Sequence, residues 1–137
     1  MDEAKFITLD NCLTILIYTD RSKSTNHMEL FTFYGGNYSS YIDYNGKKRN
    51  IKEGSAHLLE HYVCENTVSG DLLDNLRKYN VLSCNAGTSA FNTSYFFNTV
   101  CNFYECLDTF LDGIYNVSFT DENLNKTKYA VLNEIRD

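Results

Sequence analysis

Two hydrophobic periods occur in separate blocks of this chain, and their order limits the fold more than any other feature of the sequence. Residues 93–101 are rich in aromatic and β-branched side chains, and one face of the expected strand carries Thr93, Tyr95, Phe97 and Thr99. Residues 103–116 instead carry large apolar side chains at the three- and four-residue spacing of a helix. Separate blocks of both kinds predict an α+β domain.

The same criteria assign the other elements. We expect strands at residues 5–9, 12–18, 28–34, 81–89 and 93–101, and helices at residues 54–64, 70–79, 103–116 and from residue 120 to the chain end. Local signals predict a two-residue hairpin turn at Asp10-Asn11, a capping box formed by Asn50 and Glu53, and N-caps at Ser69 and Thr120. This order predicts a single domain, residues 1–137, with a mostly antiparallel sheet and helices packed on one face.

The charge of the chain argues against two classes of partner. There are 12 Lys and Arg against 18 Asp and Glu, which gives a net charge of −6, and the longest basic run is residues 47–49. We therefore expect no nucleic acid and no membrane as a partner. The first residues lack the features of a signal peptide, and the longest apolar stretch, residues 13–18, is too short for a bilayer. These features predict a cytoplasmic protein.

Cysteine usage bears on the redox state of the chain. The five cysteines are odd in number and include no Cys-x-x-Cys pair. This pattern favours reduced, mostly buried thiols over a disulfide framework or a thiolate zinc site. Proline is absent and asparagine is abundant, a bias that resembles proteins from low-GC bacteria.

The strongest chemical signal is the segment His-Leu-Leu-Glu-His at residues 57–61. On a helix, His57 and His61 project from the same face because they are four residues apart, so both imidazoles can reach one metal ion. Glu60 lies on that face too. This is the H-x-x-E-H arrangement of inverzincins, and imidazole with carboxylate suits Zn²⁺. A catalytic zinc site needs a third protein ligand, which we expect to be a distant carboxylate.

Chance does not explain this segment. With 3 His and 8 Glu among 137 residues, the expected number of such pentapeptides is about 0.004. The alternative that remains is a pair of exposed or hydrogen-bonded helical histidines without a metal. The third histidine, His27, stands at the start of an expected strand, and we interpret it as an ordinary strand or loop residue.

Further segments surround the motif in the order and spacing of one family. A glycine stands at residue 54, and residues 85–88 read Asn-Ala-Gly-Thr, residues 93–95 Thr-Ser-Tyr and residues 133–135 Asn-Glu-Ile. Glu134 follows His61 by 73 positions. In these features the chain resembles the pitrilysin/insulinase family of zinc peptidases, and the match runs in order across nearly the whole sequence.

The resemblance implies a role for each residue of the motif. His57, His61 and Glu134 correspond to the family's zinc ligands. Glu60 corresponds to the general base, which takes a proton from the water that attacks a peptide carbonyl and later passes it to the leaving amine. For Glu134, a solvated carboxylate near the chain end is the alternative.

Two other positions follow from the resemblance, and two depart from it. Asn85 and Ala86 correspond to an edge strand to which extended substrate adds through main-chain contacts; a bulge or turn of small residues is the alternative. Gly87 replaces the bulky apolar residue of some relatives. Thr127 stands where many relatives carry a second Glu, two turns before the last ligand, so the surroundings of the ligands are expected to be organised differently.

The sequence matches only the metal-bearing part of the family's architecture, in which repeated α/β domains form two halves that close on each other. The resemblance therefore implies a zinc-dependent endopeptidase domain that acts on peptides or small unfolded proteins and needs a second half or partner chain. A non-catalytic peptide-binding or assembly subunit of a two-component peptidase is the alternative, and a metal-free α+β protein is a third hypothesis. The intact Glu60 favours the enzyme, because non-catalytic halves typically lose motif residues.

Overall fold

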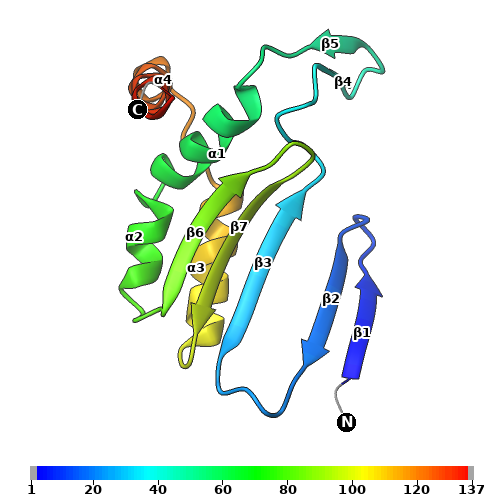
Figure 1. The fold of residues 1–137 in the computed structure, drawn as a ribbon, viewed down its shortest axis with the longest axis vertical. Coiled ribbons are helices and arrows are strands. Elements are labelled where there is room, and N and C mark those ends of the chain that lie inside the picture. Colours follow the sequence, from blue (N-terminus) through cyan, green and yellow to red (C-terminus); the bar gives the residue numbers. More distant parts are fainter. Residues whose placement is uncertain (1–2, 136–137) are drawn as a thin grey trace.

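The computed structural model describes residues 3–135 (Figure 1). Its elements are β1 (Glu3–Thr8), β2 (Thr14–Thr19), β3 (Asn26–Thr32), β4 (Ser40–Ile42), β5 (Lys48–Asn50), α1 (Ser55–Glu65), α2 (Leu72–Arg77), β6 (Ser83–Thr88), β7 (Thr93–Thr99), α3 (Phe103–Tyr115) and α4 (Asp121–Glu134). The predicted α+β class is confirmed. Helix α4 ends at Glu134, and residues 136–137, where it was also expected, lie outside the described part. Within residues 3–135 no helix has the length and apolar character needed to cross a bilayer.

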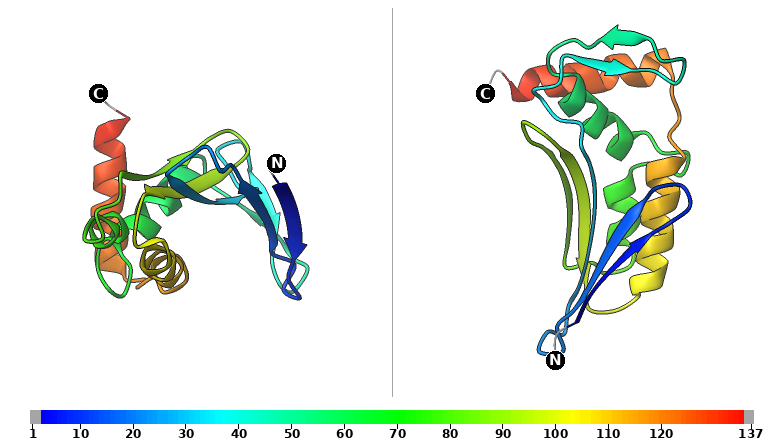
Figure 2. Two further views of the ribbon diagram at one scale, coloured as in Figure 1. Left: turned by 90° about the horizontal axis from the view of Figure 1, so that it is seen from below. Right: turned by 90° about the vertical axis from the view of Figure 1, so that its right-hand side faces the viewer.

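Strands β3, β7 and β6 form the central antiparallel sheet in that order. Strand β7 is the middle strand, and its Thr93 pairs with Thr32 of β3 on one side and Thr88 of β6 on the other. Helices α1, α2 and α3 lie on one face of this sheet, and none of the described elements covers the opposite face (Figures 1 and 2). The hairpins β1–β2 and β4–β5 are separate two-stranded sheets.

The core lies between the sheet and the helices. The alternation predicted for β7 is present, because Thr93, Tyr95, Phe97 and Thr99 are all buried. Phe97 packs against Phe110 of α3, with ring centroids 5.5 Å apart. The rest of the buried cluster comes from the helices, through Cys64, Leu72, Leu76 and Cys106. Burying one such large side chain contributes roughly 1.5–3 kcal/mol, so this cluster fixes α1, α2 and α3 against β7.

The first hairpin is present, but its predicted two-residue turn at Asp10-Asn11 is wrong. The loop between β1 and β2 spans residues 9–13. The side chain of Asn11 accepts a hydrogen bond from the main-chain N–H of Leu13 at 3.1 Å. Cys12, rather than the Asp-Asn pair, takes the left-handed conformation, with φ 68°. Main-chain hydrogen bonds of 2.9 Å from Leu9 to Leu13 and from Cys12 to Leu9 close this longer loop, and the side chain of Asn11 supports it.

The predicted capping box before α1 is also wrong. Asn50 belongs to strand β5 and pairs with Ser40 of β4, so it is not available to Glu53 as an N-cap. Helix α1 begins after Gly54, which has φ 78° and makes no side-chain cap. A left-handed glycine thus turns the chain into the helix that carries the motif, a conformation that other residues adopt only with strain.

Of the two predicted N-caps, Ser69 is wrong and Thr120 is confirmed. Ser69 does not cap α2; the side chain of Asp71 accepts a hydrogen bond from the N–H of Asp74 at 2.8 Å and starts the helix there. The negative charge of a carboxylate at this position also interacts favourably with the positive end of the helix dipole. At α4 the prediction is confirmed, because Thr120 accepts from the N–H of Asn123 at 3.1 Å.

Candidate metal centre

The two histidines of the motif lie on helix α1, on the same face. His57 and His61 place their Nε2 atoms 3.1 Å apart, with ring centroids at 4.8 Å. Their side chains are 35% and 20% exposed, respectively. The i, i+4 spacing therefore brings two imidazole nitrogens to one point beside the helix, as the sequence predicts.

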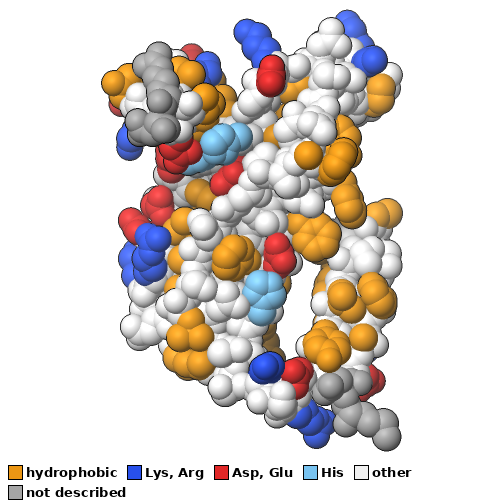
Figure 3. All heavy atoms as spheres, viewed as in Figure 1, with side chains coloured by type: hydrophobic (Ala, Val, Ile, Leu, Met, Phe, Trp, Pro, Cys, Tyr) orange, Lys and Arg blue, Asp and Glu red, His pale blue; other side chains and the backbone are white. Residues whose placement is uncertain are grey.

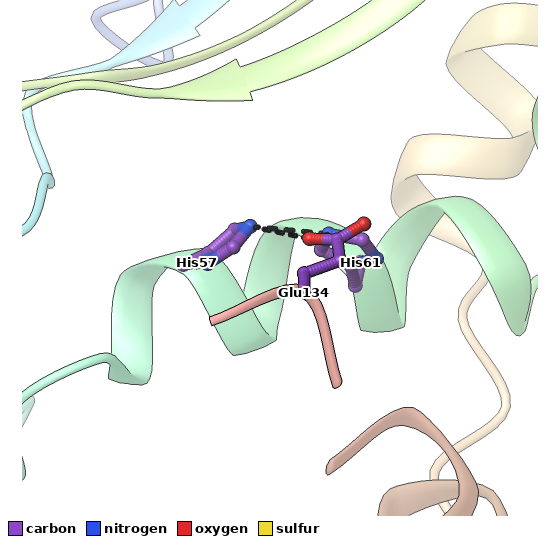
Figure 4. Close-up of side chains that lie close together, drawn as sticks. All are labelled: His57, His61 and Glu134. Carbon is purple, nitrogen blue, oxygen red and sulfur yellow. Dashed lines mark hydrogen bonds and ion pairs between the residues drawn. The ribbon is translucent and has the colours of Figure 1, made fainter. Parts of the chain in front are cut away.

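Helix α4 brings a carboxylate to the same point. Thr127, Val131 and Glu134 follow at intervals of four and three residues and share one stripe of α4; the first two are buried. The Oε2 atom of Glu134 lies 3.2 Å from Nε2 of His61 and 3.5 Å from Nε2 of His57 (Figure 4). Residues far apart in the sequence thus converge on one site.

The entry of α4 is tied to α1 by a tyrosine. The hydroxyl of Tyr62 donates to the carbonyl oxygen of Ser118 at 2.9 Å and accepts from the N–H of Thr120 at 2.9 Å. Its ring stacks on Phe119 at a centroid distance of 5.0 Å. Tyr62 is 2% exposed, so the start of α4 is held next to the residue that follows His61.

The three donor atoms fit a tetrahedral metal ion. Ligands of zinc at ~2.0–2.2 Å in tetrahedral geometry are ~3.3–3.6 Å from one another. Here one separation, 3.5 Å, lies in that range, and the other two, 3.1 and 3.2 Å, are slightly shorter. Two imidazole nitrogens and one carboxylate oxygen are a donor set that suits zinc. Three protein ligands leave the fourth position open, which is the arrangement of catalytic rather than structural zinc sites.

A cleft of about 570 Å³ runs along this group. Its walls are helix α1, the end of α4 and strand β6 with the turn that follows it, and the site residues among its lining are His57, Glu60, His61, Asn85, Ala86 and Glu134. Histidine and acidic side chains lie together between α4 and the sheet in Figure 3. All six residues predicted from the sequence therefore line one cleft.

Glu60 is held in place from the sheet. Its carboxylate is buried, with 8% of the residue exposed, and Oε2 accepts a hydrogen bond of 2.8 Å from the hydroxyl of Thr88. Thr93 lies next to Thr88, with Oγ1 atoms 3.3 Å apart, and donates to the carbonyl oxygen of Tyr34 at 2.9 Å. The carboxylate thus has a fixed orientation at the edge of the cleft.

Among residues 3–135, strand β6 pairs only with β7, so its other edge is free, and β6 lines the cleft. Hydrogen bonds of an antiparallel pair alternate, and the N–H of Ser89 donates to the carbonyl of Asn92 at 2.8 Å. The main-chain groups of Asn85 therefore point to β7, while those of Ala86 point to the free edge. Asn85 is exposed and can reach a ligand through its side chain.

The loop that follows β3 packs against the turn between β6 and β7. The N–H of Gly36 donates to the carbonyl oxygen of Ser89 at 2.8 Å. A side chain at Gly35 would place its Cβ only 2.5 Å from the main-chain nitrogen of Asn92, so glycine allows this loop to approach the turn between β6 and β7. Gly36 of this loop also lines the cleft.

Two further residues contact the site, and the sequence patterns alone did not assign a role to either. Thr88, which contacts Glu60, is the last residue of the Asn-Ala-Gly-Thr segment. Glu65 lies next to His61, with Oε1 3.4 Å from Nδ1, and its spacing of four residues from His61 is a signal for such a contact. The interpretation of His27 as an ordinary strand residue fits its position in β3, where its Nδ1 lies 2.9 Å from Oδ1 of Asn98.

Comparison with known proteins agrees with the geometry. The family model "Insulinase (Peptidase family M16)" matches residues 47–137, more than half of the chain. The chain belongs to this family. The protein named "Uncharacterized zinc protease YmfH", from Bacillus subtilis (strain 168), is 27% identical over 129 residues, which are 93% of this chain and 29% of that protein. The resemblance that the motif indicated is therefore confirmed.

Solved structures show the same fold. A crystal structure of an M16-like peptidase from Alicyclobacillus acidocaldarius superimposes with a TM-score of 0.88 at 24% identity. The match covers 98% of this chain and 31% of the Alicyclobacillus chain. A protease from Helicobacter pylori gives a TM-score of 0.80 at 19% identity, over 99% of this chain and 31% of its own. The chain therefore spans about a third of the length of these two solved proteins.

Proposed function

We propose that this chain is the zinc-binding domain, residues 1–137, of an M16 endopeptidase. The observation that carries the proposal is the convergence of His57, His61 and Glu134, whose donor atoms lie within 3.5 Å of one another. Membership in a peptidase family supports the reaction. The name of the relative YmfH, a zinc protease, supports zinc as the metal.

In this proposal a residue of this chain, Glu60, transfers the proton of the attacking water. When bound, zinc supplies a Lewis acid that polarises a peptide carbonyl and makes water more acidic. Glu60 accepts a proton from the attacking water and then donates it to the leaving amine. The hydrogen bond from Thr88 keeps one oxygen of Glu60 fixed. Because the carboxylate is rigid, its other oxygen then has a fixed direction as well.

We propose that an extended peptide adds to the free edge of β6. Ala86 supplies main-chain N–H and C=O groups, and Asn85 supplies a side-chain amide. Main-chain pairing of this kind accepts many sequences but requires an unfolded segment, which suits peptides and small unfolded proteins. In this proposal the free edge of β6 holds the peptide along residues 84–88, beside Glu60, which contacts Thr88.

The proposal includes a second half or partner chain. The side chain of Glu134 is 54% exposed, so one side of the site is open to water. Peptide hydrolysis also needs donors for the developing oxyanion, and loss of one such donor costs ~10²- to 10³-fold in rate. The greater length of the relatives is in keeping with a completing half. A cytoplasmic location stays a prediction.

Cleavage of a fluorogenic peptide tests this function. We expect the 137-residue chain alone to cleave slowly, and the protein completed by its remaining half or partner to cleave rapidly and to lose activity with a chelator. The completed Glu60→Gln protein should bind zinc and be inactive. Full activity of Glu60→Gln would contradict the mechanism. A completed protein that binds zinc and peptide without cleaving it would instead support the non-catalytic subunit.

A further inference from the structure

Next to the metal centre, hydrogen bonds centred on Thr127 join helices α1 and α4. Thr127 is fully buried. Its hydroxyl donates to Oε2 of Glu65 at 3.0 Å and accepts from Nδ2 of Asn66 at 3.2 Å. Asn66 also donates to the carbonyl oxygen of Tyr62 at 3.1 Å, which fixes the direction of its amide. The single hydroxyl proton of Thr127 is therefore directed to Glu65.

The other oxygen of Glu65 contacts a histidine of the motif. Its Oε1 lies 3.4 Å from Nδ1 of His61, slightly longer than the ~2.7–3.2 Å of most N–H···O hydrogen bonds. Nδ1 is the ring nitrogen that does not face His57 and Glu134, since those two residues lie beside Nε2. The side chains of His61 and Glu65 are 20% and 30% exposed, so the contact is largely shielded from water.

We propose that Glu65 is a positioning residue of the metal centre: it accepts the Nδ1–H of His61 and leaves Nε2 free for the metal, while Thr127 holds Glu65 in place. This inference rests on the proposed function, because it assigns Nε2 of His61 to zinc. A carboxylate that accepts the second N–H of a histidine fixes the tautomer and the ring orientation of that ligand.

The same contacts account for Thr127, the departure from the family pattern. Where many relatives carry a second Glu on the last helix, this chain has a short hydroxyl side chain with no charge. The carboxylate beside the ligands comes instead from α1, four residues after His61, and the hydroxyl on α4 is its donor. A threonine fits because it supplies one donor to Glu65 and one acceptor to Asn66.

The test measures zinc affinity of the 137-residue chain by competition with a chromogenic chelator, together with the visible absorption of the Co²⁺-substituted protein. We expect Glu65→Ala to weaken zinc binding about 10- to 100-fold, the usual effect of losing such a partner, and to change the Co²⁺ spectrum. Glu65→Gln, which keeps an acceptor oxygen, should lose less. Thr127→Val should also weaken binding, and Thr127→Ser should restore it. Glu105→Ala, on the exposed surface of α3, is the matched control.

Far-UV circular dichroism separates loss of affinity from loss of fold. If Thr127→Val unfolds, the comparison of Glu65→Ala with Glu65→Gln decides, because Glu65 is partly exposed. A folded Glu65→Ala chain with the zinc affinity and Co²⁺ spectrum of the wild type would overturn this inference and leave the proposed function intact. A wild-type chain that binds no zinc would overturn both.

Discussion

The hydroxyl of Thr88, at the end of strand β6, donates a hydrogen bond of 2.8 Å to Oε2 of Glu60 on helix α1. This contact joins the strand proposed to hold substrate to the residue proposed to move the proton. Glu60 is 8% exposed, so its carboxylate depends on protein donors more than on water. Substrate position and base position are therefore linked through one side chain.

Thr88→Val removes this donor and keeps the shape of the side chain. A buried charged group that loses a hydrogen bond costs about 1–3 kcal/mol, so we expect the free energy of unfolding to fall by that amount. Zinc affinity should not change, and peptide cleavage by the completed protein should fall about 10-fold or more. Urea unfolding, chelator competition and a kinetic assay measure the three effects.

Two variants control this prediction. Thr88→Ser retains the hydroxyl and should retain both stability and cleavage. Thr14→Val makes the same exchange at an exposed position of β2 and should change neither. A Thr88→Val chain as stable and as active as the wild type would show that the contact with Glu60 has no role in either property.

Glu134→Ala should weaken zinc binding strongly. If the ~10–16 kcal/mol of a four-ligand structural site is divided equally, one ligand contributes about 3 kcal/mol, or roughly 100-fold in affinity. Glu122→Ala, at an exposed position in the first turn of the same helix, should have no effect on zinc affinity. Equal affinities for the wild type and Glu134→Ala would leave a site of two histidines.

The cysteines should differ in reactivity towards a thiol reagent. Cys12 and Cys101 are exposed, whereas Cys64 and Cys106 are buried, which corrects the expectation of mostly buried thiols. Burial, with a smaller effect of nearby Glu60, raises the pKa of Cys64 to about 12. In the native chain at pH 8 we expect two thiols to react rapidly, and all five to react in urea. Five equally rapid thiols in the native chain would contradict the fold around α1.

The raised pKa of Cys64 also predicts a dependence of stability on pH. A thiol ionises at about 9.0 when it is free of the fold and at about 12 in the native chain. Its contribution to stability is therefore complete below pH ~9 and is lost as the pH rises towards 12. Unfolding measured in urea from pH 8 to 11 should show lower stability at the higher values for the wild type, and a smaller decrease for Cys64→Ala.

Substitution of Gly54 tests whether a left-handed residue starts helix α1. Its φ of 78° is left-handed, and a methyl group added at its Cα would meet no atom within 4 Å, so Gly54→Ala introduces backbone strain and no clash. We expect a loss of about 1–2 kcal/mol in the free energy of unfolding. Gly87→Ala, where there is equally open space and no positive φ, should be neutral or slightly stabilising. Equal effects of the two changes would contradict the left-handed start.

Patterns that extend over several residues were sufficient to predict the class of fold and the helix that carries the motif. The alternation along β7 predicted its buried face, and the i, i+4 spacing predicted that His57 and His61 share a face. Glu134 lies beside them, as the family spacing implies, although its role as a ligand stays a prediction. These features follow from repeated or paired side chains, whose geometry is set by the helix or strand itself.

Features that depend on single residues were harder to predict. The β4–β5 hairpin has strands of only three residues, and its turn signal, Asn45-Gly46, lies in a polar region with no alternation. The predicted capping box of Asn50 and Glu53 is wrong because Asn50 lies in strand β5, where it pairs with Ser40. The contact of Thr127 with Glu65 joins residues 62 positions apart, which no local pattern reveals.

Zinc stoichiometry of the purified chain tests the central claim most directly. After dialysis against metal-free buffer and then against a small excess of zinc, elemental analysis should find one Zn²⁺ per 137-residue chain. His57→Ala and His61→Ala should lose nearly all of it, and Glu60→Gln should retain it, because a general base is not a ligand. Zinc content that is the same in both histidine variants as in the wild type would contradict the account.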